Sequence, residues 1–346
     1  MIIMVFVDDF LAAFHSSESR HAYRIRDLLE KEFEMKRSGE LTQFIGIRIT
    51  RHRPTRRTWI SQAAYIEKIV ARFNLFGHRP CYTPLPSDIS QILQPAESPP
   101  DPKLVHLYQQ KCGSTLFPAI WTRPDTAFAN QVLARSLTRC TDQHLKAADH
   151  LISYLYATRD LGICYDGMKR CVAFTAASDA SFADNPDRRS SEGFIFCLFG
   201  GPIEWLARKQ RTISTSTTEA ELLAVSHAAR NYYWMKRLFR FIRFDPDHPE
   251  VIHCDNQQTV DLLMRERSIF QTKLRHVDIH RLWVRQEVQA KRLQIEWLNT
   301  SEMPADGLTK PLTRVKHEAF IRQIGMEPVP SKITVSSSPP AHSLKN

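Results

Sequence analysis

Four acidic residues in the C-terminal half of the chain have the surroundings of metal ligands. Asp179 and Asp255 each follow a short apolar run typical of a buried strand. Glu221 lies near the start of a predicted helix, and Asp306 lies in the segment SEMPADGLTK. Each acid begins or ends a regular element, so a compact fold can bring all four together. Converging carboxylates repel one another unless cations neutralise them, and oxygen-rich clusters suit Mg²⁺.

Each of these acids also has an ordinary explanation, because Asp is common where a strand ends in a turn. Asp306 has the weakest support, since Ala-Asp-Gly is also a plain turn sequence. The segment STTEAEL offers two glutamates, Glu219 and Glu221. They point about 200° apart on a helix, so only one can face the sheet. Apolar residues follow Glu221, which we therefore predict as the ligand, and we predict a capping role for Glu219.

A second acidic pair lies near the N-terminus. Asp8 and Asp9 separate two apolar runs, MIIMVFV and FLAAF. Adjacent carboxylates repel each other and are costly near a core. The pair is therefore either an exposed turn or the metal-binding pair of a nucleotidyl transferase, and both alternatives stay open on the residues alone.

The composition limits the class of protein. The 346 residues have room for two domains, and the net charge of +10 favours a polyanionic partner, either nucleic acid or an acidic membrane surface. No apolar run approaches the roughly 20 residues that span a bilayer. The apolar opening has no basic residue before it and is not a signal peptide. The seven cysteines form no CxxC pair, which indicates reduced cysteines in an intracellular protein.

The order of predicted elements changes along the chain. Before the proline-rich stretch at 83–103 we predict a hairpin at 1–14, a strand at 41–50 with a hairpin partner from 59, and helices at 16–33 and 63–73, and after it, up to residue 165, we predict helices. Beyond residue 171 we predict strands at 171–178, 193–198, 203–207, 251–254 and 293–298, with helices at 217–241, 256–265 and 277–290. This order implies a mixed sheet with helices on its faces.

Several motifs together resemble one family. SDASFADNPDRRSSEGFIF, STTEAELLAVSHAAR, HCDNQQTVDL, TKLRHVDIHRLWVRQEV and SEMPADGLTKPL are similar to the ribonuclease H domain of copia-type LTR retrotransposon Pol polyproteins. VFVDDFL, FEMKRSGELTQFIGIRI, YTPLP and TRPDTAFA resemble the end of the reverse transcriptase palm and the connection of the same polyproteins. The similarity is colinear over about residues 1–326.

The resemblance implies a fold and a domain order. We expect an α/β fold, with a ribonuclease H-like mixed five-stranded sheet and flanking helices, preceded by a truncated α+β remnant of the reverse transcriptase palm and thumb and by a helical connector. The expected domains are the palm/thumb remnant at 1–82, a proline-rich linker at 83–103, the helical connection at 104–165, the ribonuclease H-like domain at 166–326 and a disordered tail at 327–346.

The resemblance also implies site residues. It implies that Asp179, Glu221, Asp255 and Asp306 are the catalytic carboxylates that bind two metal ions. It also implies that Asp8 and Asp9 correspond to the metal-binding pair of the polymerase. Residues that fall where ribonucleases H contact nucleic acid are Thr217, Thr218 and Gln257. Ser181 and Phe182 replace the more usual Asp-Trp, which leaves Asp179 as the ligand on its strand end.

The implied activity is Mg²⁺-dependent endonucleolytic cleavage of RNA in RNA–DNA hybrids, with two Mg²⁺ ions, or Mn²⁺ in their place. The implied partners are the hybrid and the rest of the polyprotein, with no membrane. The expected location is inside the cell, in the cytoplasm or a virus-like particle, with a nuclear phase left open. Because the chain starts just before Asp8, we expect no polymerase activity from it. The alternative is a catalytically silent relic that keeps the fold and only binds nucleic acid.

Overall fold

The C-terminal half is built around the central strand β7 (Phe174–Ser181), which pairs with a neighbour on each side. The computed structural model describes residues 1–35, 39–86, 89, 94–168, 173–246, 250–264 and 275–331, with only the backbone described at 275–278 and 281. β7 pairs antiparallel with β8 (Ser191–Leu198), and β8 pairs antiparallel with β9 (Gly201–Lys209). On its other side β7 pairs parallel with β10 (Val251–Cys254), and β10 pairs parallel with β11 (Gln294–Trp297). The strand order β11-β10-β7-β8-β9 gives a mixed five-stranded sheet, which confirms the predicted fold class.

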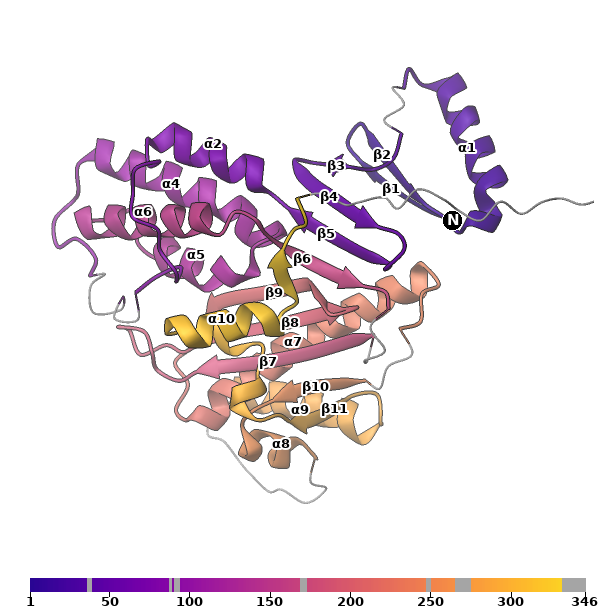
Figure 1. Ribbon diagram of the computed structural model, residues 1–346. Coiled ribbons are helices and arrows are strands. Elements are labelled where there is room, and N and C mark those ends of the chain that lie inside the picture. The colour runs from indigo at the N-terminus through magenta and orange to yellow at the C-terminus, as the bar shows by residue number, and fades with distance from the viewer. Residues whose placement is uncertain are drawn as a thin grey trace, which may run out of the picture.

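One face of this sheet is covered by the long helix α7 (Thr217–Phe241), behind the strands in Figure 1. Its buried residues recur at helical spacing and pack on Phe174, Phe194 and Phe196 of the strands. The helix begins where the Ser216 hydroxyl accepts a hydrogen bond from the Glu219 N–H. Two further helices, α8 (Gln257–Met264) and α9 (Arg275–Gln289), pack on the same side against α7.

The opposite face of the sheet carries the C-terminal segment. It contains the short 3₁₀ helices η3 (Thr300–Glu302) and η4 (Asp306–Leu308), followed by α10 (Arg314–Gln323), in front of the strands in Figure 1. Successive strand residues point to opposite faces, so Ala176 packs toward α7 while Ala177 packs with Leu308 and Phe320. Asp179, two residues after Ala177, therefore faces the C-terminal segment.

A second sheet joins distant parts of the chain. β4 (Ile47–His52) pairs antiparallel with β3 (Gln43–Phe44) and with β5 (Arg57–Ser61). β6 (Leu161–Asp166) pairs antiparallel with β5 on one side and with the C-terminal strand β12 (Met326–Pro328) on the other. The order is β12-β6-β5-β4-β3. Strands that come before the first sheet in the sequence therefore pair with a strand that comes after it.

This second sheet crosses the predicted domain limits. β6 is a strand within the segment predicted as a helical connection, and β12 extends two residues into the segment predicted as a disordered tail. The structure does not describe residues 332–346, which make up most of that predicted tail. The domain limits stay a prediction, although the secondary structure at these two points differs from it.

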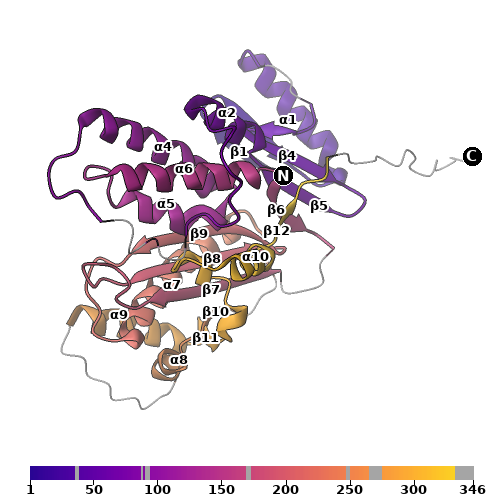
Figure 2. The same cartoon turned by 60° about the vertical axis from the view of Figure 1, so that its left-hand side comes forward.

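The segment between β5 and β6 of the second sheet is helical. It holds α2 (Ala63–Phe73), α4 (Pro102–Trp121), α5 (Ala127–Ala134) and α6 (Asp142–Ala157), with the 3₁₀ turn η2 (Pro124–Thr126) between α4 and α5. Figure 2 shows α4, α5 and α6 together as a layer above β9. This layer has its own apolar core around Tyr108, Leu133 and Leu151. It also contacts the sheet, because the Trp205 indole donates a hydrogen bond to the Ala119 carbonyl at 2.8 Å.

The N-terminal hairpin forms a separate two-stranded sheet beside β3 and β4 in Figure 1, where the Phe6 ring lies 6.4 Å from the ring of Phe44 on β3. β1 (Ile2–Phe6) pairs only with β2 (Asp9–Ala13), and η1 (Ser16–Glu18) leads into α1 (Ser19–Glu32). Asp8 and Asp9 are exposed at its tip. Within the described part of the chain, no helix is long and apolar enough to cross a membrane.

Candidate metal centre

Three of the predicted acids come together at one edge of the first sheet. Asp179 lies near the end of β7, Asp255 directly follows β10, and Asp306 begins η4. One carboxylate oxygen from each lies within 4.8 Å of the others. Because β7 and β10 are adjacent and parallel, their carboxyl ends meet at this edge. Asp179 is buried, while Asp255 and Asp306 are half-buried and open toward solvent.

Glu221 lies beside this group rather than within it. It reaches the strand ends from the α7 side, where its Oε1 accepts a hydrogen bond from the Ala180 N–H at 3.2 Å. The Cys254 thiol donates to its Oε2 at 3.8 Å. Glu219 points elsewhere, since its Oε2 accepts from the Thr215 N–H at 2.7 Å and hydroxyl at 2.6 Å. The structure thus brings three of the four predicted ligands into one group and turns Glu221, not Glu219, toward them.

Each aspartate of the metal centre receives one donor from the C-terminal segment. The Thr300 hydroxyl donates to Asp255 Oδ2 at 2.8 Å. The Thr309 hydroxyl donates to Asp179 Oδ2, and the Lys310 ammonium pairs with Asp306 Oδ1. These three donors were not predicted. Lys310 had a local signal, because it follows its partner Asp306 by one helical turn. Thr300 and Thr309 lie 45 and 130 residues from their partners and had none.

Burial and mutual repulsion shape the charges of this centre. Burial raises the pKa of Asp179 to about 6; Lys310 and Thr309 oppose this rise, while the charges of Asp255 and Asp306 add to it. Burial also raises the pKa of Glu221 well above its ordinary value, helped by the charges of Asp179 and Asp255. Although burial works against it, the surrounding carboxylates raise the pKa of Lys310. The metal-free centre therefore holds its charges at a cost that a bound cation would relieve.

The predicted nucleic-acid residues lie at the starts of two helices. Thr217 is exposed and Thr218 is half-buried at the start of α7, and Gln257 is exposed at the start of α8. The two helix starts are tied together, because the Thr218 hydroxyl donates to Gln258 Oε1 at 2.9 Å. The Gln257 amide donates to Asp261 at 3.1 Å. Contact of these residues with nucleic acid stays a prediction.

The predicted polymerase pair does not form part of a larger group. Among the described residues, Asp179, Asp255 and Asp306 are the one set of three or more potential metal ligands, so no third ligand joins Asp8 and Asp9. The cysteines that the structure describes are free.

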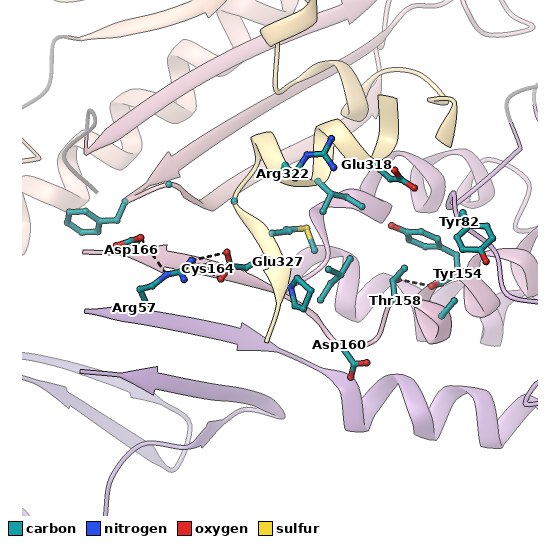
Figure 3. Close-up of a pocket in the computed structure, with 18 residues that line it drawn as sticks. Arg57, Tyr82, Tyr154, Thr158, Asp160, Cys164, Asp166, Glu318, Arg322 and Glu327 are labelled. Carbon is teal, nitrogen blue, oxygen red and sulfur yellow. Dashed lines mark hydrogen bonds and ion pairs between the residues drawn. The ribbon is translucent and has the colours of Figure 1, made fainter. Parts of the chain in front are cut away.

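A cavity lies away from the metal centre, where the C-terminal strand β12 joins the second sheet. It has a volume of about 810 Å³ and runs along β6, β12 and α10, as Figure 3 shows. Arg57 lies on its wall between Asp166 and Glu327. None of the acids of the metal centre lines it. The candidate metal centre is therefore separate from this cavity.

The fold and this centre define a class of protein. A mixed five-stranded sheet with acids at the ends of two adjacent parallel strands is a ribonuclease H-like nucleic-acid enzyme fold. The family model described as "Reverse transcriptase (RNA-dependent DNA polymerase)" matches residues 1–87. Together these findings place a reverse transcriptase segment and a ribonuclease H-like segment in one chain.

Several known proteins of similar sequence are retrotransposon proteins. The retrovirus-related Pol polyprotein from transposon TNT 1-94 of Nicotiana tabacum is 31% identical over 330 residues, which is 94% of this chain and 24% of that protein. The polyprotein from transposon RE2 of Arabidopsis thaliana is 31% identical over 95% of this chain and 22% of its own length. The putative transposon Ty5-1 protein of Saccharomyces cerevisiae is 31% identical over 65% of this chain and 71% of that protein.

The chain belongs to the family of copia-type retrotransposon Pol polyproteins, as its motifs predicted, and it spans about a quarter of the length of the plant polyproteins that it matches. Some solved structures are similar to part of this chain. A complex of LC11-RNase H1 with an RNA/DNA hybrid has a TM-score of 0.30 and 14% identity, over 39% of this chain and 93% of that one. The foamy viral protease-reverse transcriptase has a TM-score of 0.44 and 14% identity, over 86% of this chain and 36% of that one.

Proposed function

We propose that this chain hydrolyses the RNA strand of RNA–DNA hybrids as an Mg²⁺-dependent endonuclease, within a longer reverse transcriptase polyprotein. The observation that carries the proposal is the group of Asp179, Asp255 and Asp306, whose oxygens lie within 4.8 Å at the ends of β7 and β10. A net charge of +10 supports a polyanionic substrate. The much greater length of the plant relatives supports the rest of the polyprotein as a partner.

The donor set fits Mg²⁺. Carboxylate oxygens are the hard ligands that Mg²⁺ prefers, and Mn²⁺ accepts the same ligands. The three aspartates, with Glu221 beside them, would hold the ions. Two Mg²⁺ ions there would activate the attacking water and stabilise the leaving oxygen of an in-line displacement.

Other residues of the chain would prepare this site. Thr300 and Thr309 occupy the Oδ2 atoms of Asp255 and Asp179, which leaves the Oδ1 atoms of both aspartates for a cation. Thr217, Thr218 and Gln257, at the starts of α7 and α8, would contact the backbone of the hybrid. Discrimination of RNA from DNA would come from contacts with the 2′-hydroxyl in a shallow minor groove.

The direct test is cleavage of an end-labelled RNA–DNA hybrid by the purified chain in Mg²⁺ or in EDTA. We expect internal cuts in the RNA strand with Mg²⁺ and none in EDTA. Asp179→Asn and Asp255→Asn should each lower the rate more than about a hundredfold, since even groups that only orient metal ligands cost 10–100-fold when lost. Cleavage that survives EDTA or either substitution would contradict the proposal.

Glu219 and Glu221 provide a matched pair of substitutions. Glu221→Gln should lower cleavage strongly, because its carboxylate faces the aspartates, whereas Glu219→Gln should keep it, because glutamine can still accept the hydrogen bond from the Thr215 N–H. Loss of cleavage only with Glu219→Gln would reverse the assignment. Tight binding of the hybrid without any cleavage by the wild-type chain would favour the silent relic.

A further inference from the structure

The motif Thr122-Arg123-Pro124-Asp125 has no part in the proposed chemistry, yet it forms the most deeply buried ion pair that the structure describes. Arg123 is fully buried and Asp125 is 2% exposed. Arg123 Nε donates to Asp125 Oδ1 at 2.9 Å, and its Nη2 donates to Oδ2 at 2.7 Å. Removing two charges from water is expensive, so a hydrophobic pair would stabilise the fold as well. The ion pair is therefore better explained by a role in fixing the arrangement of the residues around it.

The ion pair extends to α10 through one tyrosine. The Tyr154 hydroxyl on α6 lies 2.6 Å from Asp125 Oδ2 and 2.7 Å from His317 Nε2 on α10. A carboxylate can only accept, so the single hydroxyl hydrogen of Tyr154 goes to Asp125. We therefore assign the hydrogen of the imidazole to Nε2, which donates to the tyrosine oxygen. Burial lowers the pKa of His317, which keeps the ring neutral in this arrangement.

Helix α10 is in turn packed tightly against the residue next to a predicted metal ligand. A Cβ added to Gly307 would lie 2.5 Å from the Phe320 ring, closer than real Cβ contacts come. Phe320 is buried, and its ring lies 6.1 Å from that of His317. A shift of α10 would therefore move Gly307 and, with it, Asp306.

We propose that the buried cluster of Arg123, Asp125, Tyr154 and His317 is a positioning element for Asp306, which makes the helical layer before residue 158 part of the nuclease. Figure 3 shows Tyr154 next to the helix that carries Glu318, where the two parts of the chain meet. The inference rests on the proposed function for its consequence in catalysis. Its structural part, the placement of Asp306, is independent of it.

Tyr108 offers a matched control for Tyr154. Both side chains are fully buried in the helical layer, and the Tyr108 hydroxyl donates to the Leu133 carbonyl at 2.7 Å without contacting α10. Tyr154→Phe and Tyr108→Phe each remove one buried hydroxyl, and Tyr154→Phe should cost more thermal stability because its hydroxyl donates to a carboxylate. Only Tyr154→Phe breaks the connection to His317.

The first measurement is hydrogen exchange in the full metal-free chain. Tyr154→Phe and His317→Phe should speed exchange of the amides of residues 306–310 about tenfold, the effect of weakened local stability. Tyr108→Phe should leave those amides unchanged. His317→Gln should also leave them near wild type, because its amide can donate to Tyr154 as the imidazole does. Unchanged exchange in Tyr154→Phe, or equal acceleration in Tyr108→Phe, would overturn the proposal.

The second measurement is Mn²⁺ binding by calorimetry. Tyr154→Phe should weaken binding roughly tenfold, the lower end of the effect for groups that orient metal ligands. Tyr108→Phe should bind as the wild type does, and an equal loss in both variants would show a merely structural role. If the wild type binds no Mn²⁺ and cleaves no hybrid, the proposed function fails, while the exchange experiment still decides the placement of Asp306.

Discussion

Asp179→Asn should stabilise the metal-free protein at neutral pH. The pKa of Asp179 is raised from 3.8 to about 6, mainly by burial. Each unit of pKa difference is worth about 1.4 kcal/mol, so the ionised carboxylate costs the fold about 3 kcal/mol. Because the folded state holds the proton more tightly, this cost is small below pH 4, grows between pH 4 and 6 and is constant above. Asparagine is never ionised, and its amide oxygen can still accept from Thr309.

The assay is denaturant unfolding of both proteins in EDTA at pH 4 and at pH 7.5. The variant should gain about 3 kcal/mol at pH 7.5 and less than about 1 kcal/mol at pH 4. Excess Mg²⁺ should reverse the difference at pH 7.5, because binding to the folded wild type alone adds stability. A variant that is equally or less stable than the wild type at pH 7.5 in EDTA would refute the reasoning.

Three further predictions concern charged residues other than Asp179. Lys310→Met should tighten Mn²⁺ binding roughly fivefold, because the ammonium then no longer competes with the metal for Asp306. A fivefold change in affinity corresponds to about the free energy of a partly exposed ion pair. Weaker Mn²⁺ binding in calorimetry would contradict this prediction. The purified chain should extend no primer on a homopolymer template, because among the described residues no third metal ligand joins Asp8 and Asp9; any metal-dependent extension would count against this. Glu327→Gln should lower the free energy of unfolding by about 1 kcal/mol through loss of its ion pair across the second sheet, and an unchanged denaturation midpoint would show that the pair contributes nothing.

The sequence predicted the parts of the site that depend on local pattern. Asp179 and Asp255 were identifiable because each ends an apolar run, and parallel neighbours must then bring those ends together. The choice of Glu221 over Glu219 as the residue that faces the sheet followed from helical geometry and the apolar residues after it. The predicted bounds of the helix at 217–241 agree with the observed ones, because its apolar residues repeat at helical spacing over about seven turns.

The missed features depend on contacts between distant residues. Thr300 contacts an aspartate 45 residues away, and Tyr154 contacts a histidine 163 residues away. No local pattern encodes such a partner. β12 is three residues long, and its extended form depends on pairing with β6. Short edge strands of this kind are set by the partner that they meet, so a proline-rich tail and a final strand look alike in sequence.

The pairing of β12 with the second sheet has a consequence for the synthesis of the protein on the ribosome. Arg57 on β5 and Glu327 on β12 are 270 residues apart, yet Glu327 accepts hydrogen bonds from both Arg57 and the Trp59 indole. β12 pairs with β6, which at a synthesis rate of about 5–20 residues per second leaves the ribosome roughly 8–32 seconds before β12 does. During that interval the edge that β12 will close is open to strands from other chains. Nascent copies on the same messenger therefore risk pairing with one another, and slower translation of the last third of the chain lengthens the time at risk.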